Sequence, residues 1–274
     1  MIMKNVTTNT GSILASLRQY LPYSTNAIHS VLTYPQKTVI YQNATENNSE
    51  IITSVAYNSG YNPHIWYSPI IWLSIGGVEK NEKLIAATLE YLADKFTSFI
   101  SMVPKSITLG KLEERFKFYK ENLMIRRNSQ PPLHSPYTVR RLDSKDAMES
   151  LRLSSGIEPN DVRLDPVGAE KLFLKERETY GIFMEGKLVC RGSIMASSGS
   201  YYSVGGFVTD QEYRGMGLGT RIVDFICREV ELRGGFPFLT VRSDNDIAIK
   251  LYKKLGFETL QEITFIDYNT GVVP

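Results

Sequence analysis

Apolar residues recur with helical periodicity in two segments of the second half of the chain. Ile222, Ile226 and Val230 lie on one stripe of residues 217–233, and this spacing predicts an amphipathic helix. Residues 245–255 repeat apolar positions at the same intervals and end just before a glycine, which commonly follows a helix C-terminus. Both helices are expected to pack one face against a sheet.

The rest of this half alternates short apolar runs with turn residues. The pair Glu185-Gly186 separates two such runs and predicts a β-hairpin. Strands are expected at residues 137–142, 179–184, 187–196, 201–209, 237–242 and 258–268, and two further helices at 143–154 and after Asp165-Pro166. The resulting order, β-α-α-β-β-β-α-β-α-β, predicts an α/β domain built on a mixed sheet.

The first half contains a weaker version of one of these segments. An apolar run at residues 65–75 precedes a helical pattern at 82–96, in the order and length of residues 201–233. This similarity predicts an internal duplication, although any strand-loop-helix unit would look alike at this level. The loop at residues 78–82 has two acids and no arginine, so it would repel a phosphate rather than bind one.

A stretch with three prolines, residues 126–136, divides the chain into nearly equal halves. Proline and polar residues favour an extended linker over a helix or a strand. The sequence therefore predicts an N-terminal domain at residues 1–125, a linker at 126–136 and a C-terminal domain at 137–274.

Composition and charge limit the possible functions. The chain has 274 residues, 42% of them hydrophobic, and a formal net charge of +2, so it can bury a core and lacks the basic signature of a nucleic-acid-binding protein. Its three histidines and two cysteines are scattered, so neither a metal site nor a disulfide framework is expected. The sequence has no signal-peptide pattern and no apolar run of about 18 residues, which predicts a cytoplasmic protein without a membrane span.

The candidate chemistry lies between the predicted strand at 201–209 and the helix that follows it. Residues 214–219 read Arg-Gly-Met-Gly-Leu-Gly. Glycines let backbone amides approach phosphate oxygens closely, and the start of a helix presents unpaired amides and a positive dipole to an anion. Arg214 and Arg221 can add charge-assisted contacts. The pattern predicts a phosphate-binding loop.

Other phosphate-binding motifs fit this loop less well. The dinucleotide fingerprint needs Gly-x-Gly-x-x-Gly, and a Walker loop needs Gly-Lys followed by Ser or Thr; the loop has neither. A glycine-rich turn without a ligand stays an alternative for the loop taken alone.

A second motif follows the loop at residues 245–257, which read Asn-Asp-Ile-Ala-Ile-Lys-Leu-Tyr-Lys-Lys-Leu-Gly-Phe. Together with residues 208–219, this segment closely resembles the GNAT superfamily, the GCN5-related N-acetyltransferases, and the resemblance covers about residues 137–274. It implies a GNAT fold, in which helices flank a mixed, mostly antiparallel central sheet. The degenerate first half also resembles two-domain members such as the glycine N-acyltransferase-like group, which implies two tandem GNAT-like domains.

The resemblance implies a binding site for acetyl-CoA or another acyl-CoA where the strands at 201–209 and 237–242 diverge. The pantetheine arm would pair with the backbone of Phe207, Val208 and Thr209, as an added strand does. A β-bulge would free the amide of about Val208 for the thioester carbonyl. The implied cofactor-binding residues are Phe207, Val208, Thr209, Arg214, Gly215, Met216, Gly217, Leu218, Gly219, Thr220, Asn245 and Tyr252.

Two residues are implied in catalysis, Tyr252 and, through its backbone amide, Val208. An amine that attacks a thioester forms an oxyanion, which needs a preorganised N–H donor, and then expels a thiolate. Tyr252 would lie beside that thiolate and act mainly as a hydrogen-bond donor, since a phenol with a pKa of about 10 is a weaker acid than a thiol. Its spacing alone also fits a core aromatic on the helix stripe.

The chain departs from the family pattern in two places. Some members carry a glutamate on the strand before the bulge, whereas residues 201–203 here are Tyr-Tyr-Ser, so no general base is assigned. Residues 209–213 lack the proline that is common after the first loop residue, although no phosphate donor is lost with it.

The expected function is N-acyl transfer, most often N-acetyl transfer, from acyl-CoA to a primary amine by direct attack in a ternary complex. The alternative is a non-catalytic acyl-CoA-binding regulatory module, which the missing base favours. The acceptor is expected to be a small-molecule or peptide amine, and the sequence does not identify it. Both a monomer and a homodimer are compatible with the sequence.

Overall fold

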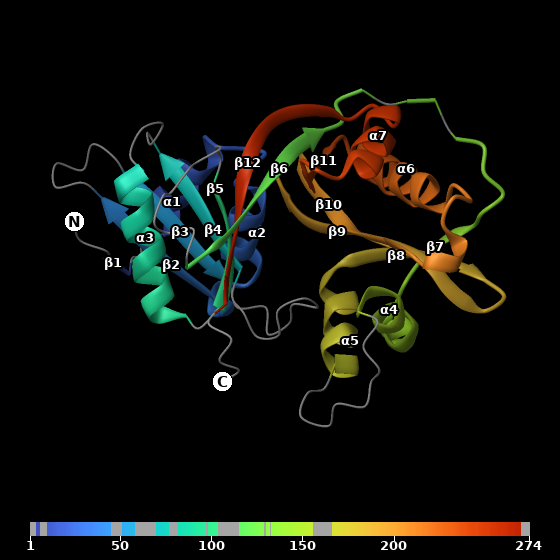
Figure 1. The fold of residues 1–274 in the computed structure, drawn as a ribbon, viewed down its shortest axis with the longest axis horizontal. Coiled ribbons are helices and arrows are strands. Elements are labelled where there is room, and N and C mark those ends of the chain that lie inside the picture. The colour runs from blue at the N-terminus through green and yellow to red at the C-terminus, as the bar shows by residue number, and fades with distance from the viewer. Residues whose placement is uncertain are drawn as a thin grey trace. The chain divides into compact units, whose positions relative to one another are not determined.

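The computed structural model describes residues 4–5, 10–44, 51–57, 70–76, 82–96, 98–103, 115–128, 130–131, 133–155 and 166–269. Helices and a mixed, mostly antiparallel sheet make up this part of the chain, so the α/β class predicted from the sequence is confirmed. The chain folds into two compact units (Figure 1). Unit 1 comprises residues 1–123, 240–245 and 259–274, and unit 2 comprises 124–239 and 246–258.

Unit 1 is built on the strand order β1-β2-β3-β4-β5-β12. The first four strands pair antiparallel, β4 and β5 pair parallel, and β5 and β12 pair antiparallel. Its elements are β1 (Lys4–Asn5), α1 (Thr10–Arg18), α2 (Thr25–Thr33), the 3-10 turn η1 (Pro35–Lys37), β2 (Thr38–Ala44), β3 (Ile51–Tyr57), β4 (Ile70–Gly76), α3 (Glu82–Lys95), β5 (Ser98–Val103), most of β6 (Lys117–Ile125) and most of β12 (Glu258–Asn269).

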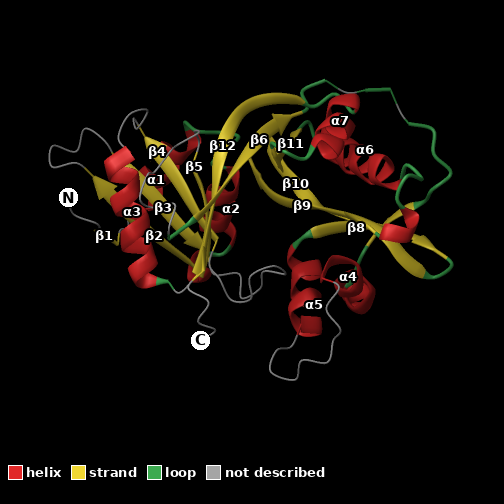
Figure 2. Ribbon diagram, viewed as in Figure 1, coloured by secondary structure: helices red, strands yellow, loops and turns green. Residues whose placement is uncertain are grey.

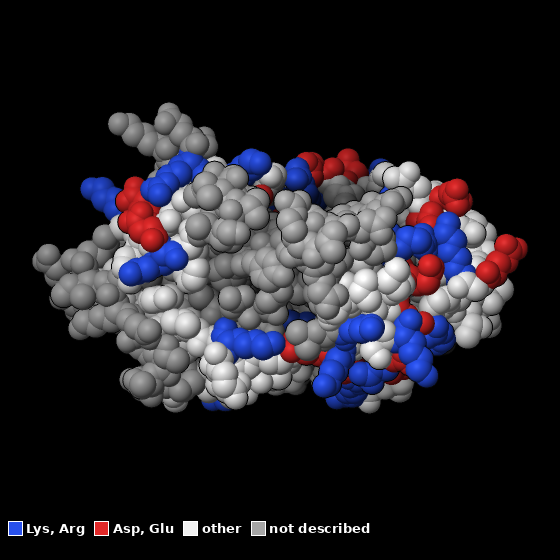
Figure 3. Space-filling view, turned by 90° about the horizontal axis from the view of Figure 1, so that it is seen from below, with Lys and Arg blue, Asp and Glu red and all other residues white. Residues whose placement is uncertain are grey.

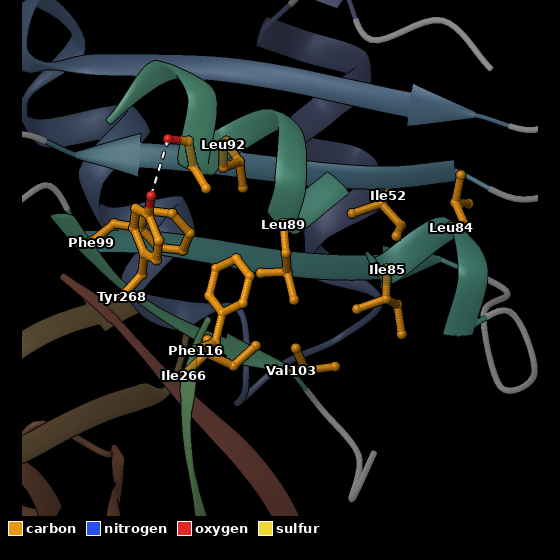
Figure 4. Packing of buried hydrophobic residues seen from close by; sticks show 11 residues of the cluster. Ile52, Leu84, Ile85, Leu89, Leu92, Phe99, Val103, Phe116, Ile266 and Tyr268 are labelled. Carbon is orange, nitrogen blue, oxygen red and sulfur yellow. Dashed lines mark hydrogen bonds between the residues drawn. The ribbon is translucent and has the colours of Figure 1, made fainter. Parts of the chain in front are cut away.

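One core cluster of unit 1 lies between α3 and the sheet (Figure 4). Leu89 and Leu92 of α3 are fully buried and share this cluster with Phe99 of β5. Tyr268 of β12 lies 5.1 Å from Phe99 between ring centroids, and its hydroxyl donates to the carbonyl of Ala93 at 3.4 Å. The C-terminal strand is therefore an integral part of the core of unit 1.

Unit 2 has the strand order β11-β10-β9-β8-β7, in which β10 and β11 are parallel and the other pairs antiparallel. Its elements are β7 (Val139–Arg141), η3 (Ser144–Asp146), α4 (Ala147–Ser155), α5 (Pro166–Glu176), β8 (Glu178–Met184), β9 (Lys187–Ser198), β10 (Tyr201–Thr209), η4 (Gln211–Tyr213), α6 (Leu218–Glu231), the first part of β11 (Phe236–Arg242) and α7 (Asp246–Lys254).

Helices cover both faces of the sheet of unit 2 (Figure 2). On one face, Arg191 of β9 bonds Ser150 of α4 and Glu170 of α5. The next residue, Gly192, faces the opposite side, where it lies against Ile226 of α6. Successive residues of a strand point to opposite faces, so β9 separates the α4–α5 layer from α6.

The sequence signals of unit 2 act where they were expected. Glu185 and Gly186 both have positive φ, 51° and 82°, as the two central residues of a type I′ hairpin require. Asp143 is the N-cap of η3 and forms a capping box, in which its side chain accepts a hydrogen bond from the amide of Lys145. Gly256, with φ 85°, follows α7 in the left-handed conformation that ends many helices.

The two units repeat one arrangement of strands. Among the described residues of unit 1, the parallel pairing of β4 with β5 covers Ile70–Trp72 and Ile100–Met102, and α3 connects the two strands. In unit 2 the pairing of β10 with β11 covers only Tyr201–Ser203 and Phe236–Phe238, and α6 connects them. This correspondence supports the predicted internal duplication. Residues 65–69 and the loop at 77–81 lie outside the described residues.

Each unit also contains chain from the other half of the sequence. Residues 259–269 of β12 belong to unit 1, next to β5, whereas Met124 and Ile125 of β6 belong to unit 2. The amide of Arg126 donates to the carbonyl of Pro237 at 2.9 Å within unit 2. The two units therefore do not coincide with the ranges 1–125 and 137–274. The division of the chain into two domains at these ranges stays a prediction.

Candidate functional site

Strands β10 and β11 diverge after a short paired stretch. Their ladder ends at Ser203 and Phe238, while β10 continues to Thr209. Parallel strands that stay paired satisfy each other's backbone groups, so divergence leaves one edge of β10 without this partner. The divergence predicted from the sequence lies where it was expected.

A β-bulge interrupts β10 within this diverging stretch. Gly205 pairs with Ser193 and Val208 with Arg191, so Gly206 and Phe207 together face a single residue of β9, Gly192. Gly206 has φ 64°, and a Cβ atom on Gly192 would overlap the ring of Phe207. The glycine opposite the bulge therefore makes room for Phe207.

The register fixes the directions of the amides after the bulge. The amide of Asp210 donates to the carbonyl of Val189 at 2.9 Å, and Val208 stands two residues earlier in the same register. Because amides alternate in direction along an antiparallel strand, the amide of Val208 faces β9. Those of Phe207 and Thr209 face the edge from which β11 has diverged.

The glycine loop follows β10 after Asp210 and the short turn η4. Gly215 and Gly217 both have φ 81°, and Gly217 is the N-cap of α6. The first backbone bond of the helix joins the amide of Arg221 to the carbonyl of Gly217 at 3.0 Å. The amides of Leu218, Gly219 and Thr220 precede this bond, so they belong to the turn whose donors lack helical acceptors.

The remaining loop residues differ in exposure. Leu218 is buried in the core, whereas Met216 is 43% exposed. Arg214 is exposed, and its Nε donates to the carbonyl of Thr209 at 3.4 Å, so its guanidinium stays next to the loop. Arg221 donates to the carbonyl of Tyr137 at 3.3 Å.

Gly219 brings three elements together. A Cβ atom built on it would lie 3.6 Å from Oγ1 of Thr209 in β10 and 3.7 Å from Cδ1 of Leu251 in α7. The start of α6, the end of β10 and the middle of α7 are therefore neighbours. The loop and the second motif, which are separate in the sequence, meet here.

Tyr252 lies on the same part of α7. Its side chain is buried, with its ring centroid 6.3 Å from that of Phe207 and 5.7 Å from that of Phe257. Burial, with a smaller contribution from Cys227, raises the pKa of Tyr252 from 10.0 to about 12. The residue is thus both a core aromatic and a neighbour of the bulge, and its phenol keeps its proton at neutral pH.

Acids near the site are committed to other contacts. Glu178 forms a bidentate pair with Arg233 at 2.6 and 2.8 Å, which lowers the pKa of the carboxyl group. Glu212 lies 3.2 Å from Lys187. Neither of these two carboxylates is available as a base at the bulge.

The two cysteines of unit 2 are poorly suited to carry an acyl group. Cys190 lies next to Thr209, with its Sγ 3.2 Å from Oγ1, and burial raises the pKa of its thiol to about 11. Burial also raises the pKa of Cys227. Since only the thiolate is a good nucleophile, both thiols are inert at neutral pH.

Asn245 belongs to residues 240–245, which group with unit 1, whereas the other predicted site residues belong to unit 2. Its amide donates to the carbonyl of Arg242 at 3.0 Å, just before α7 begins. Its predicted contact with the pantetheine arm stays a prediction.

Neither surface charge nor metal-binding residues point to a second ligand site in the described part of the chain. Figure 3 shows basic and acidic side chains on the same face of unit 2. Over the described residues, no group of three or more His, Cys, Asp or Glu side chains could hold a metal ion. No helix in the described ranges is long and apolar enough to cross a membrane.

A groove of about 670 Å³ opens elsewhere in unit 2, next to the end of β7 and to α5. Its lining residues are Arg141, Leu142, Asp143, Ser144, Lys171, Leu174 and Lys175. None of them belongs to the predicted cofactor-binding set, so this groove does not bear on that assignment.

Comparison with known proteins gives three kinds of similarity. Residues 179–266 match the family model described as FR47-like protein. A segment of 57 residues is 39% identical to the N-alpha-acetyltransferase RimI of Mycobacterium tuberculosis, and this segment is 21% of the chain and 35% of that protein. The chain thus spans about a third of the length of this curated relative.

Solved structures share the fold over nearly the whole chain. A GNAT-family acetyltransferase from Novosphingobium aromaticivorans has a TM-score of 0.62 at 18% identity and covers 91% of this chain and 99% of its own. A tandem GNAT protein from the clavulanic acid biosynthesis pathway has a TM-score of 0.62 at 14% identity and covers 100% of this chain and 99% of its own. These neighbours show that the chain has the GNAT fold, as the sequence motifs predicted, and the FR47-like segment and the local similarity to RimI agree with it.

Proposed function

We propose that unit 2 transfers an acyl group, in the simplest case acetyl, from acyl-CoA to a primary amine. The observation that carries this proposal is the divergence of β10 from β11, followed directly by the glycine loop at the start of α6. These features supply a strand edge for an amide-rich arm and an amide-lined helix start for a diphosphate. The acceptor is proposed to be a small-molecule or peptide amine.

The cofactor would lie along β10 and end at the loop. The amides of Phe207 and Thr209 face the open edge and can pair with the amide groups of the pantetheine arm. The amides of Gly215 to Thr220 can receive the diphosphate, and the positive end of α6 and Arg214 add attraction. The φ of 81° at Gly217 supports this role, since a side chain is unfavourable there and the backbone stays accessible.

The chemistry follows from the same geometry. The amine nitrogen attacks the thioester carbonyl carbon, forming the C–N bond and an oxyanion, and the C–S bond then breaks to release the thiolate of CoA. We place the oxyanion donor at the amide of Phe207 instead of Val208, because the amide of Val208 faces β9. Tyr252 donates a hydrogen bond to the thiolate, and the amine proton leaves to solvent.

Direct transfer in a ternary complex is favoured over a covalent acyl-enzyme. Burial raises the pKa of Cys190, whose thiol also has a hydrogen-bond contact with Thr209. A poorly ionised thiol is a poor nucleophile.

The second candidate is a regulatory module that binds acyl-CoA without turnover. It is favoured by the absence of an acid at residues 201–203 and by the pairing of Glu178 with Arg233. An assay of the wild-type chain with several acyl-CoA donors and a panel of amines separates the two candidates. Saturable CoA binding with no turnover of any amine would favour the module.

Calorimetric titration tests the cofactor assignment itself. Wild-type protein is expected to bind CoA and acetyl-CoA with micromolar affinity, and the double variant Gly217→Val/Gly219→Val is expected to lose this binding. The second substitution adds methyl groups beside Thr209 and Leu251, which a Cβ atom at this position already contacts at 3.6 and 3.7 Å. Unchanged affinity in a folded double variant would contradict the assignment.

A further inference from the structure

Asp210 follows β10 and precedes the turn η4, and its side chain makes two ion pairs and one hydrogen bond. Its Oδ2 lies 3.2 Å from NH1 of Arg152 and 3.0 Å from Nζ of Lys187. Its Oδ1 accepts the amide of Glu212 at 3.2 Å, and its carbonyl accepts the amide of Tyr213 at 3.0 Å. The side chain is only 12% exposed although it belongs to a surface loop.

Arg152 is itself held in place from α4. Its NH2 donates to the carbonyl of Leu188 at 2.7 Å, and its guanidinium pairs with Glu149 at 3.0 Å. Glu149 in turn accepts the amide of Leu188 at 3.0 Å. The side chains of Arg152 and Glu149 therefore bind the carbonyl and the amide of Leu188 in β9.

Leu188 lies next to a register shift between β8 and β9. Ile182 pairs with Cys190 and Phe183 with Leu188, so Val189 is an extra residue in the ladder with β8. A bulge of this kind leaves backbone groups without their usual ladder partners. Beside this shift, Glu149 and Arg152 bind the backbone groups of Leu188, and Arg152 also contacts Asp210.

Lys187 completes the arrangement from the hairpin. Its Nζ bridges Asp210 and Glu212, at 3.0 and 3.2 Å, and lies 5.3 Å from the ring centroid of Tyr213. Arg152 and Lys187 therefore both contact the segment that contains η4, the short turn that leads into the glycine loop.

We propose that Arg152 and Lys187 are positioning residues that hold Asp210, and with it the glycine loop, in the conformation that receives a diphosphate. The proposal rests on the proposed function. It assigns two effects to the cations: they fix the exit of the chain from β10, and they offset a carboxylate that would otherwise lie close to the diphosphate.

The experiment compares ligands with and without a diphosphate. CoA affinity is measured by calorimetry and pantetheine affinity by an NMR titration of the labelled protein, for wild type and for Arg152→Ala. Arg152→Ala is expected to weaken CoA binding about tenfold, the equivalent of ~1.4 kcal/mol. Pantetheine affinity is expected to change less than about twofold, which is within the usual effect of a surface substitution.

Two further variants separate positioning from charge. Asp210→Asn is expected to weaken CoA binding as Arg152→Ala does, and the double variant is expected to lose little more, since both break one interaction. Arg152→Lys, which keeps the charge, is expected to recover part of the affinity. Arg140→Ala is the matched control, because its ion pair with Asp146 at 2.7 Å is of the same type and does not involve the loop.

The outcomes are distinct. Tighter CoA binding by Asp210→Asn would show that only charge matters and would overturn the positioning role. An equal loss for CoA and pantetheine, or a loss in Arg140→Ala as large as that in Arg152→Ala, would also overturn it. If wild-type protein binds neither ligand, the proposed function fails instead.

Discussion

The rings of Phe207 and Tyr252 lie 6.3 Å apart between centroids, which brings the bulge of β10 and the second turn of α7 together. Phe207 sits at the bulge because Gly192 opposite leaves space for it. Tyr252 is in place because its helix begins directly after β11 and buries the phenol. The residues of the proposed oxyanion donor and the proposed thiolate partner are thus neighbours in unit 2.

Removing the hydroxyl of Tyr252 tests its role in transfer. Tyr252→Phe is expected to lower kcat about 100-fold, the lower end of what a positioned proton donor contributes, and to leave CoA affinity nearly unchanged, since the ring contacts stay. Steady-state kinetics and calorimetry measure the two quantities. A variant with wild-type kcat would show that Tyr252 is only a core aromatic.

The pKa of Tyr252 also predicts how stability depends on pH. The unfolded chain releases this proton near pH 10.0, whereas the folded chain holds it to about pH 12. The stability that the buried neutral phenol contributes is therefore fully present below pH 10.0 and is lost as the pH rises to about 12, by up to roughly 3 kcal/mol. Urea unfolding of wild type and Tyr252→Phe below and above pH 10.0 checks this. Parallel losses in both proteins would contradict it, since Cys190 titrates in both.

Gly217 and Gly199 form a matched pair for testing the loop. Both have positive φ, 81° and 56°, and a Cβ atom would meet no other atom within 4 Å at either site. Alanine at either position is expected to cost about 1 kcal/mol of stability, because the left-handed conformation is unfavourable for a side chain. Only Gly217→Ala is expected to weaken CoA binding. Equal affinities of the two variants, measured by calorimetry, would remove the glycine loop from the binding site.

Local sequence signals were sufficient for most of unit 2. The stripe that contains Ile222, Ile226 and Val230 predicted α6 within two residues at either end, and Glu185-Gly186 predicted the β8–β9 hairpin. These features depend on periodicity and turn chemistry over a few residues, which a single sequence records directly.

The features that the sequence did not predict depend on residues far apart in the chain. The amide direction at Val208 depends on a bulge whose space is set by Gly192, and the anchor at Asp210 depends on Arg152, 58 residues away. The pairing of β12 with β5 joins residues more than 160 positions apart, such as Ile266 and Ser101. Such pairings are decided by the tertiary fold, and the local pattern of either segment is compatible with other partners.

The place of β12 in unit 1 predicts the effect of shortening the chain. Ile266 and Tyr268 are 0% and 4% exposed in the core of unit 1. A chain that ends at residue 258 is therefore expected to lose the cooperative unfolding of unit 1, because burying these side chains stabilises the core by several kcal/mol (about 3–5 for one large aromatic). Trp72 of β4 belongs to unit 1, so its fluorescence follows this unit during urea unfolding. A wild-type fluorescence transition in the shortened chain would contradict the prediction.

The stability of unit 2 is expected to depend on Arg126, a residue of the segment between the two halves of the sequence. Its guanidinium is fully buried, with Nε 2.8 Å from Glu231 and NH1 3.3 Å from Asp224 in α6. Arg126→Met would remove the buried counter-charge of Glu231 and one of the two cations at Asp224, whose other partner is Arg228 at 2.9 Å. It is expected to destabilise unit 2 by about 3–5 kcal/mol.

The neighbouring Arg127 is the control for this prediction, since its pair with Glu258 at 3.4 Å is about half exposed on both sides. Arg127→Met is expected to cost less than about 1 kcal/mol, as exposed ion pairs do. Replacing Asp224 and Glu231 by leucine together with Arg126→Met is expected to recover much of the stability, because it removes the two carboxylates together with their buried counter-charge. Denaturant unfolding of the three variants measures these differences. Equal costs for Arg126→Met and Arg127→Met would mean that the buried cluster contributes no more to folding than a surface ion pair.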